Sequence, residues 1–172
     1  MRKLLPILVG ACAMAIVAVA TSSGASSNAG PRDALWGGGH FRWYLGDLAF
    51  ERDMSINVEL GHFGDADGSF VYGNNGSNGS INSVSCLAVS GNHAVIGGVT
   101  QAGIKYLVYA IDNGTPASGV RDQITPVLQP DAADLAQLPE GFPKVCPSPD
   151  TVLGGFPYSD LTGGDIVIRD VS

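Results

Sequence analysis

Apolar and polar positions alternate most clearly over residues 54–60. The apolar positions are Met54, Ile56, Val58 and Leu60. Side chains that alternate with a period of two point to opposite faces of a strand, so this segment predicts a strand with one buried and one solvent-facing side. The sequence Asp65-Ala-Asp67-Gly68 follows, ahead of an apolar run over 69–72. An Asp-Gly pair between two such runs predicts a hairpin turn.

Three further apolar runs, rich in Val, Ile and Tyr, lie between Ile81 and Asp112. Short Ser-Gly-Asn and Gln-Ala-Gly sequences separate them, and these residues favour tight turns, so we expect an antiparallel three-strand meander. The last run, 104–111, is apolar at both odd and even positions. Such a strand is covered on both faces, by a second layer, a partner or a ligand cavity. Gly97-Gly98 in the middle run predicts a bulge or a sharp bend.

The remaining predicted elements are short. We expect order to begin near 34–36, after which the three glycines at 37–39 allow a bend or a close backbone approach. Residues 124–128 predict an edge strand that a proline limits. Asp131–Leu138 predicts a helix that an Asp caps and a Pro stops. Residues 165–169 predict the last strand.

The composition suits an all-β domain. The chain has 172 residues, with 24 Gly, 10 Pro and only 15% charged residues, which favours many turns and few long helices. Short strands at regular spacing predict one antiparallel β-sandwich or flattened β-barrel of about eight strands with one short helix, over residues 34–172. The formal net charge is −7 and no basic stripe is present, so we expect no nucleic-acid partner.

The N-terminus has the pattern of an export signal. Arg2 and Lys3 precede an apolar run, and small residues at Ala18 and Ala20 fit a cleavage site, so residues 1–20 predict a signal peptide. Residues 21–33 predict a flexible spacer, and we expect no membrane span after cleavage. An alternative is lipid attachment at Cys12 in the sequence Val-Gly-Ala-Cys, which would anchor the protein to the cell envelope.

Two cysteines remain after the leader. In an exported protein, Cys86 and Cys146 most simply form one disulfide, which would attach the irregular segment near Cys146 to the central meander. The alternative is a nucleophilic cysteine, but Cys86 lies in an apolar strand, where a thiolate is disfavoured.

No sequence motif predicts catalysis or a cofactor. His40, His62 and His93 are isolated, and neither a Gly-x-Ser-x-Gly elbow nor a phosphate-binding glycine loop is present. The Asp65-x-Asp67 pattern resembles the start of a calcium loop but lacks its remaining ligands, so these two residues are weak metal candidates. Catalytic groups need not be close in sequence, so a secreted hydrolase remains an alternative.

Four large aromatic side chains near the start of the domain are candidates for ligand binding. They are Trp36, Phe41, Trp43 and Tyr44. Aromatic rings this close in sequence form either a stacking platform for a ligand or part of the hydrophobic core.

Three short sequences together resemble a known group of proteins. They are Cys86-Leu-Ala-Val-x-Gly-Asn-x-Ala94 leading into Ile96-Gly-Gly, Asp112-Asn-Gly-x-Pro116, and Leu161-x-Gly-Gly-x-Ile166. They resemble small uncharacterised exported β proteins of high-GC Gram-positive bacteria. The resemblance implies an exported β domain with no established activity.

Two functional hypotheses follow. The first is a non-catalytic secreted or envelope-associated domain with a binding, adhesion or structural role, whose partner is an extracellular protein or a glycan. The second is a barrel that holds a small apolar ligand, because strand 104–111 is apolar on both faces and the four aromatic residues could contact such a ligand.

Overall fold

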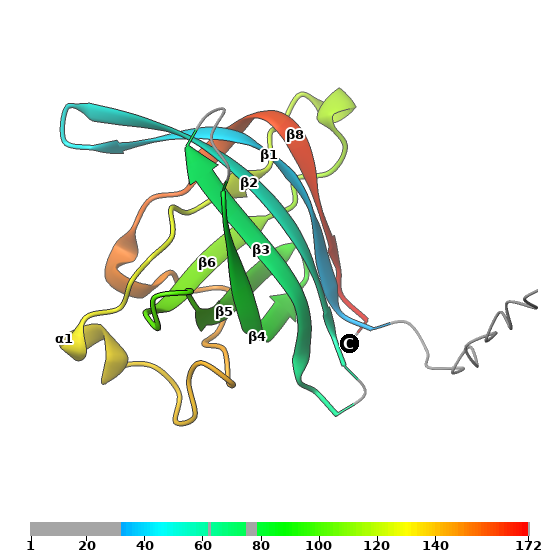
Figure 1. Cartoon of the computed structure of the whole chain (residues 1–172). Helices are drawn as coiled ribbons and strands as arrows, with labels where there is room; N and C mark the ends of the chain where they lie inside the picture. The colour runs from blue at the N-terminus through cyan, green and yellow to red at the C-terminus, as the bar shows by residue number, and fades with distance from the viewer. Residues whose placement is uncertain (1–31, 62, 75–78, 172) are drawn as a thin grey trace, which may run out of the picture.

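Eight strands form one closed antiparallel barrel in the computed structural model (Figure 1), which describes residues 32–61, 63–74 and 79–171. Each strand pairs with the next, and β8 closes the barrel on β1. In chain order the strands are β1 (Ala34–Leu45), β2 (Leu48–Leu60), β3 (Ala66–Asn74), β4 (Ser80–Ser90), β5 (His93–Val99), β6 (Lys105–Ile111), β7 (Gln123–Ile124) and β8 (Ser159–Arg169). The all-β prediction is confirmed. Of the two predicted architectures, β-sandwich and flattened β-barrel, the structure has the barrel.

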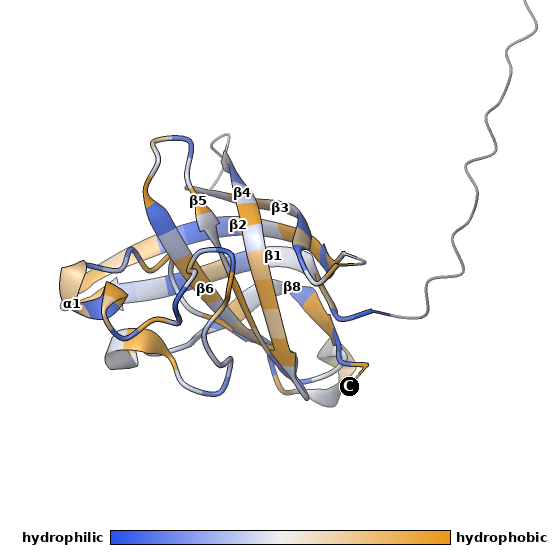
Figure 2. Cartoon of the chain, turned by 90° about the horizontal axis from the view of Figure 1, so that it is seen from below, coloured by the Kyte–Doolittle hydropathy of each residue, from blue (hydrophilic) through white to orange (hydrophobic). Residues whose placement is uncertain are grey.

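The predicted alternation is present along the strands. In β2, Met54, Ile56 and Val58 are buried, whereas Ser55 and Asn57 are exposed. The hydropathy colouring changes repeatedly along the barrel strands for the same reason (Figure 2). The inward-facing residues fill the barrel, and the largest of them are Phe41, Phe70, Tyr106, Leu35, Ile56, Ile96, Ile124 and Ile166.

The central strands are covered on both faces, as the sequence predicts. On β6, Tyr106 and Val108 belong to the barrel interior, whereas Leu107 and Tyr109 belong to a second apolar cluster. The chain between β7 and β8 covers this outer cluster and contributes Leu128 and Phe142 to it. The predicted disulfide between Cys86 and Cys146 joins this covering segment to β4.

Glycines allow the strands to bend at two places. A Cβ on Gly37 or Gly39 would overlap backbone carbonyl oxygens of β8, so the close approach of β1 and β8 requires glycine. The register of β4 shifts between Val84 and Cys86, opposite Gly97 and Gly98 of β5. The predicted bulge at the glycine pair is therefore confirmed.

Carboxylates replace strand pairing along one seam of the barrel. β7 has only two residues, so most of the β8 edge that faces it has no strand beside it. Asp122 Oδ2 accepts from the Ile166 amide at 2.7 Å, and Asp112 Oδ2 accepts from the Ile168 amide at 2.9 Å. Their other oxygens accept amides of the chain between β6 and β7: Asn113 at 2.9 Å for Asp122 Oδ1, and Gly114 at 2.7 Å for Asp112 Oδ1. Each carboxylate thus ties β8 to the β6–β7 connection.

Three predicted elements have different bounds. The turn after β2 begins at Gly61, whose amide donates to Asp65 O, and Gly68 lies within β3, because pairing Phe70 with Ile56 places both side chains in the barrel. The predicted edge strand is reduced to β7, since Pro126 has no amide hydrogen, although Leu128 still pairs with Leu107. β8 starts six residues before the predicted strand at 165.

The predicted helix is one short turn. α1 spans Ala132–Leu135, and the Asp131 side chain caps it by accepting the Ala133 and Asp134 amides, as predicted. The helix buries none of its residues, and tertiary packing is what normally extends a short helix. Two 3₁₀ turns, Pro116–Ser118 and Leu153–Gly155, complete the described structure. The predicted signal peptide, most of the spacer, Cys12 and His62 lie outside the described residues.

The disulfide should contribute substantially to stability. Replacing Cys86 and Cys146 by Ala removes a link that spans 60 residues. Loss of the loop-closure constraint should lower the free energy of unfolding by about 4 kcal/mol, measured by urea denaturation. Reductant should destabilise the native protein by a similar amount and leave the double variant unchanged. A loss below about 1 kcal/mol would contradict this role.

The carboxylate seam predicts that Asp112→Asn lowers stability more than removal of the same charge at an exposed position. An asparagine has one acceptor oxygen, so its amide group would face the amide of either Gly114 or Ile168. The unfolding free energy should fall by about 2 kcal/mol. Asp47→Asn, at the exposed β1–β2 turn, removes the same charge and should change stability little. Equal effects of the two substitutions would show that charge, and not hydrogen bonding, is responsible.

Candidate functional site

A series of aromatic rings runs through the barrel interior towards one end. Phe70 and Tyr106 stack with their ring centroids 5.8 Å apart. Tyr72 follows, 5.9 Å from Phe70 and 6.2 Å from Phe41. The Tyr106 hydroxyl donates to Ser83 O, and burial raises the pKa of this phenol. The barrel interior is thus filled with aromatic side chains as far as Tyr72.

A cavity of about 500 Å³ opens at the end of the barrel beyond Tyr72. Below, this cavity is called the mouth. Its lining comes from the β1–β2 hairpin, the adjoining ends of β3 and β4, the β5–β6 loop and the chain after β7. No charged side chain lines the mouth among the described residues; its lining residues are Trp43, Tyr72, Ser80, Asn82, Thr100, Gln101, Ala102, Ile104, Pro126, Val127 and Gln129.

Trp43 forms the aromatic wall of the mouth. Its ring stacks on Phe50 of the neighbouring strand, with centroids 4.8 Å apart and planes inclined by 20°. The guanidinium of Arg52 lies 5.3 Å from the Phe50 centroid and 5.8 Å from that of Tyr72, which fixes the two aromatic groups relative to each other. Trp43 Nε1 is buried on the side of the indole next to Tyr72. The indole therefore offers a flat aromatic face to the mouth.

Polar groups surround this aromatic wall. The Tyr72 hydroxyl accepts from Arg52 Nε at 3.2 Å. Burial raises the pKa of Tyr72, and the positive charge of Arg52 opposes this shift, so the phenol stays protonated at neutral pH. Asn82 is buried, and its amide nitrogen donates to Ser80 O and Phe70 O. The mouth can thus combine ring stacking with hydrogen bonds from neutral groups.

The four aromatic candidates from the sequence do not form one site. Phe41 is fully buried in the barrel core. Trp36 faces outwards, is 37% exposed, and has the Arg169 guanidinium 5.6 Å from its ring. Tyr44 is 60% exposed and lines a different cavity, between the ends of β1 and β8. Of the four, only Trp43 lines the mouth.

Sequence reasoning missed the partners of Trp43. Tyr72, Asn82 and Val127 come from three separate parts of the chain and meet only after barrel closure. One signal was present: Asn82 lies two residues before Val84, at a position that should face the core. A polar residue at an inward position of a strand is unusual and often indicates a site.

The histidines and the weak metal candidates lie apart from the mouth. His40 Nδ1 pairs with Asp53 Oδ1 on the outer surface, and His93 Nδ1 lies 3.5 Å from Asp150 Oδ1. Asp65 and Asp67 are exposed at the start of β3. Within the described residues, no group of three or more His, Cys, Asp or Glu side chains is arranged to hold a metal ion.

A third carboxyl group lies beside the carboxylate seam. Asp165 Oδ1 is buried, and this carboxyl lies close to Asp122. Desolvation raises the pKa of Asp165, and a hydrogen bond to Asp122 and the negative charges of Asp122 and Asp112 raise it further. The protonated Asp165 carboxyl can donate to Asp122, whereas the ionised form meets two like charges.

Comparison with known proteins gives no family. No protein-family model matches the chain, and no curated protein or solved structure matches it. The described part of the chain contains no helix that is long and apolar enough to cross a membrane.

The raised pKa of Asp165 predicts that stability depends on pH. Its pKa in the folded protein exceeds the unfolded value of 3.8, so the folded state binds more protons between the two values. The stabilising contribution is complete below about pH 3.8 and is lost as pH rises through the folded-state pKa. Asp165→Asn should therefore raise the urea midpoint at neutral pH and leave it nearly unchanged at low pH.

Asp47→Asn serves as the matched control for the lost charge, because this carboxyl is exposed at a hairpin turn. Its midpoint should follow that of the native protein at every pH. A gain for Asp165→Asn that is the same at pH 3 and pH 7 would contradict a role for ionisation.

Proposed function

We propose that this protein is an exported, non-catalytic β-barrel that binds a small, uncharged ligand with a planar apolar ring at its mouth. The observation that carries the proposal is Trp43. Its half-buried ring lines an uncharged cavity of about 500 Å³ and is held in place by stacking on Phe50. The flat indole face can stack on a ligand ring, a contact worth about 0.5–1.5 kcal/mol beyond the area that it buries.

The lining of the mouth favours a neutral ligand over an anion or a cation. An ion entering the mouth would lose water without gaining a counter-charge, and this cost is large in a low-dielectric site. Arg52 lies beside the aromatic wall, and its Nε and its guanidinium face are already engaged by Tyr72 and Phe50. The cavity volume is within the range of small-molecule sites, and an eight-stranded barrel of this width holds at most one such ligand.

A second candidate function is capture of an extracellular protein by the β1–β2 hairpin. This hairpin projects beyond the rest of the barrel (Figure 1). Its tip exposes Tyr44, Leu45 and Leu48 by 60%, 59% and 61%. Exposed apolar side chains clustered on a projection are typical of protein contacts. This role does not require the mouth, so the two functions can be separated by substitution.

Binding at the mouth can be measured with the two tryptophans as matched positions. N-phenyl-1-naphthylamine is a neutral, ring-bearing probe whose emission rises in apolar sites. The native protein and Trp36→Phe should bind it with the same Kd, whereas Trp43→Phe should bind it about tenfold more weakly, since a tenfold change corresponds to 1.4 kcal/mol. That loss is the size expected for one aromatic stacking contact.

Charge selectivity forms the second part of this test. Neutral 2-naphthol should displace the probe, and naphthalene-2-sulfonate should not. The proposal fails if the native protein shows no saturable emission increase, if Trp43→Phe binds like the native protein, or if the sulfonate competes as well as the naphthol.

A further inference from the structure

β1 and β8 separate at the mouth end of the barrel. Their pairing extends only to Phe41, opposite Leu161. Beyond this pair, β1 continues into the projecting hairpin with β2, while β8 pairs with β7. A cavity of about 490 Å³ lies in the wedge between the two strands and is lined by side chains of Arg42, Tyr44, Arg121, Tyr158, Asp160 and Thr162, among others.

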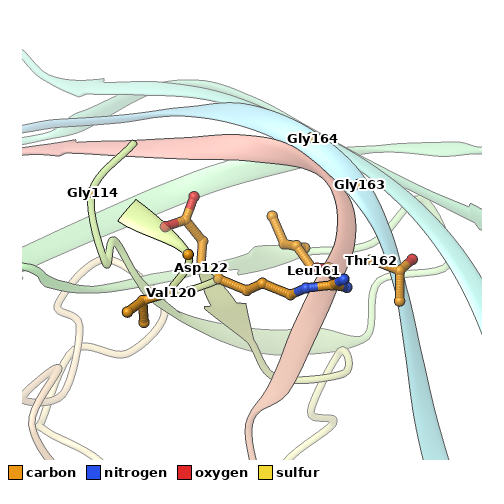
Figure 3. A pocket seen from close by; sticks show the side chains of 9 residues that line it. Gly114, Val120, Asp122, Leu161, Thr162, Gly163 and Gly164 are labelled. Atoms are coloured by element: carbon orange, nitrogen blue, oxygen red, sulfur yellow. Dashed lines mark hydrogen bonds between the residues drawn. The ribbon is translucent and has the colours of Figure 1, made fainter. Parts of the chain in front are cut away.

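A second hollow of about 500 Å³ adjoins this wedge. Arg121 and Thr162 line both cavities, so together they form one groove along the start of β8. Gly114, Val120 and Asp122 lie on one side of the hollow and Leu161 to Gly164 on the other (Figure 3). Below, the two cavities together are called the β8 groove. It shares no lining residue with the mouth.

Arg121 lies in the middle of the β8 groove with most of its hydrogen-bonding capacity unused. Its Nη1 donates to Leu161 O at 3.1 Å, which holds the side chain against β8. Among the described residues, no carboxylate lies within 4.0 Å of this guanidinium. The adjacent Asp122 is buried, and its oxygens accept the Asn113 and Ile166 amides. A guanidinium has five N–H donors, so several remain for a ligand.

The local charge contrasts with that of the whole chain. Arg42 adds a second guanidinium to the β8 groove and pairs with Glu51 across the β1–β2 hairpin. Asp160 is the one acidic side chain of the wedge, and its Oδ1 accepts from Gln123 Nε2 at 2.7 Å. Asp122 also lines the groove, but its two oxygens accept backbone amides, so Arg121, which has no carboxylate within 4.0 Å among the described residues, offers a local site for an anion.

The lining also offers neutral groups to a polar ligand. Thr162 Oγ1 donates to His40 O, which orients its lone pairs to accept from another group. The rings and hydroxyls of Tyr44 and Tyr158 flank the same cavity. Aromatic faces beside polar donors and acceptors suit a molecule with hydroxyl groups and an apolar ring face.

We infer that the β8 groove is a second binding site, which takes a carboxylate or phosphate group carried on a sugar or small polyol, with Arg121 as the principal contact. A guanidinium binds a carboxylate or a phosphate through two parallel hydrogen bonds, so Arg121 can bind a ligand that carries either group. Arg42 adds attraction, and the tyrosines and Thr162 contact the polyol. The site differs from the mouth, which takes a neutral ligand.

Nitrogen-15 NMR of the whole protein at low ionic strength tests this inference. Glucuronate and glycerol 1-phosphate are titrated separately, with glucose and glycerol as neutral controls. At least one of the two anions should shift the backbone amides of Arg121, Thr162 and Gly163 saturably. The anion that binds with the lower Kd shows whether the site prefers a carboxylate or a phosphate. The neutral controls should leave these amides unshifted.

Two matched substitutions complete the test. Arg121→Gln should raise the Kd of the effective anion at least tenfold, because it removes the bidentate contact. Lys144→Gln removes the same charge from an exposed position outside the β8 groove and should change the Kd less than twofold. Native shifts for both variants with neutral ligands would confirm that they fold.

The inference is overturned if neither anion shifts the amides of the groove. It is also overturned if the two variants weaken binding equally, since general charge screening would then explain the effect, or if glucose and glycerol bind as well as the anions. Because N-phenyl-1-naphthylamine binding at the mouth is measured separately, either site can fail without affecting the other.

Discussion

Closure of the barrel depends on two aspartate side chains. A closed barrel is stable only when every strand edge finds hydrogen-bond partners, and β7 is too short to cover the edge of β8. Asp112 and Asp122 supply acceptors to the Ile168 and Ile166 amides from a loop, where a neighbouring strand would normally supply carbonyls. The two aspartate side chains thus replace the backbone hydrogen bonds of a neighbouring strand. As a result, negative charge is concentrated along this seam of the barrel.

This form of closure also leaves a groove on the surface beside β8. The loop contacts β8 mainly through the Asp112 and Asp122 side chains and one backbone bond, from the Leu161 amide to Asp122 O, and the β8 groove remains open beside the seam. The same loop contains Arg121, immediately before Asp122. One residue of this pair completes the barrel and its neighbour faces solvent. At the mouth the situation is different, because strands of unequal length leave the Trp43 side of the hairpin without a partner strand.

Much of the fold could be predicted from local pattern. Alternation over 54–60, apolar residues on both faces of 104–111 and the glycine pair at 97–98 each identified a feature that the structure contains, and two cysteines were enough for the disulfide. These features depend on neighbours within one strand or hairpin. The two sites do not, because Trp43, Tyr72, Asn82 and Val127 meet only through the order and register of strands, which periodicity leaves undetermined.

The first and last described residues meet at the end of the barrel opposite the mouth. Ala34 of β1 pairs with Arg169 of β8, and the Val171 amide donates to Asp33 Oδ1. A circular permutant that joins these ends through a short linker and opens at the β4–β5 turn, Gly91 and Asn92, would keep every strand pairing intact. In the natural connectivity, a chain attached at either end leaves from the face opposite the mouth. The barrel can thus be tethered to a surface or to another domain while its aromatic opening faces outwards.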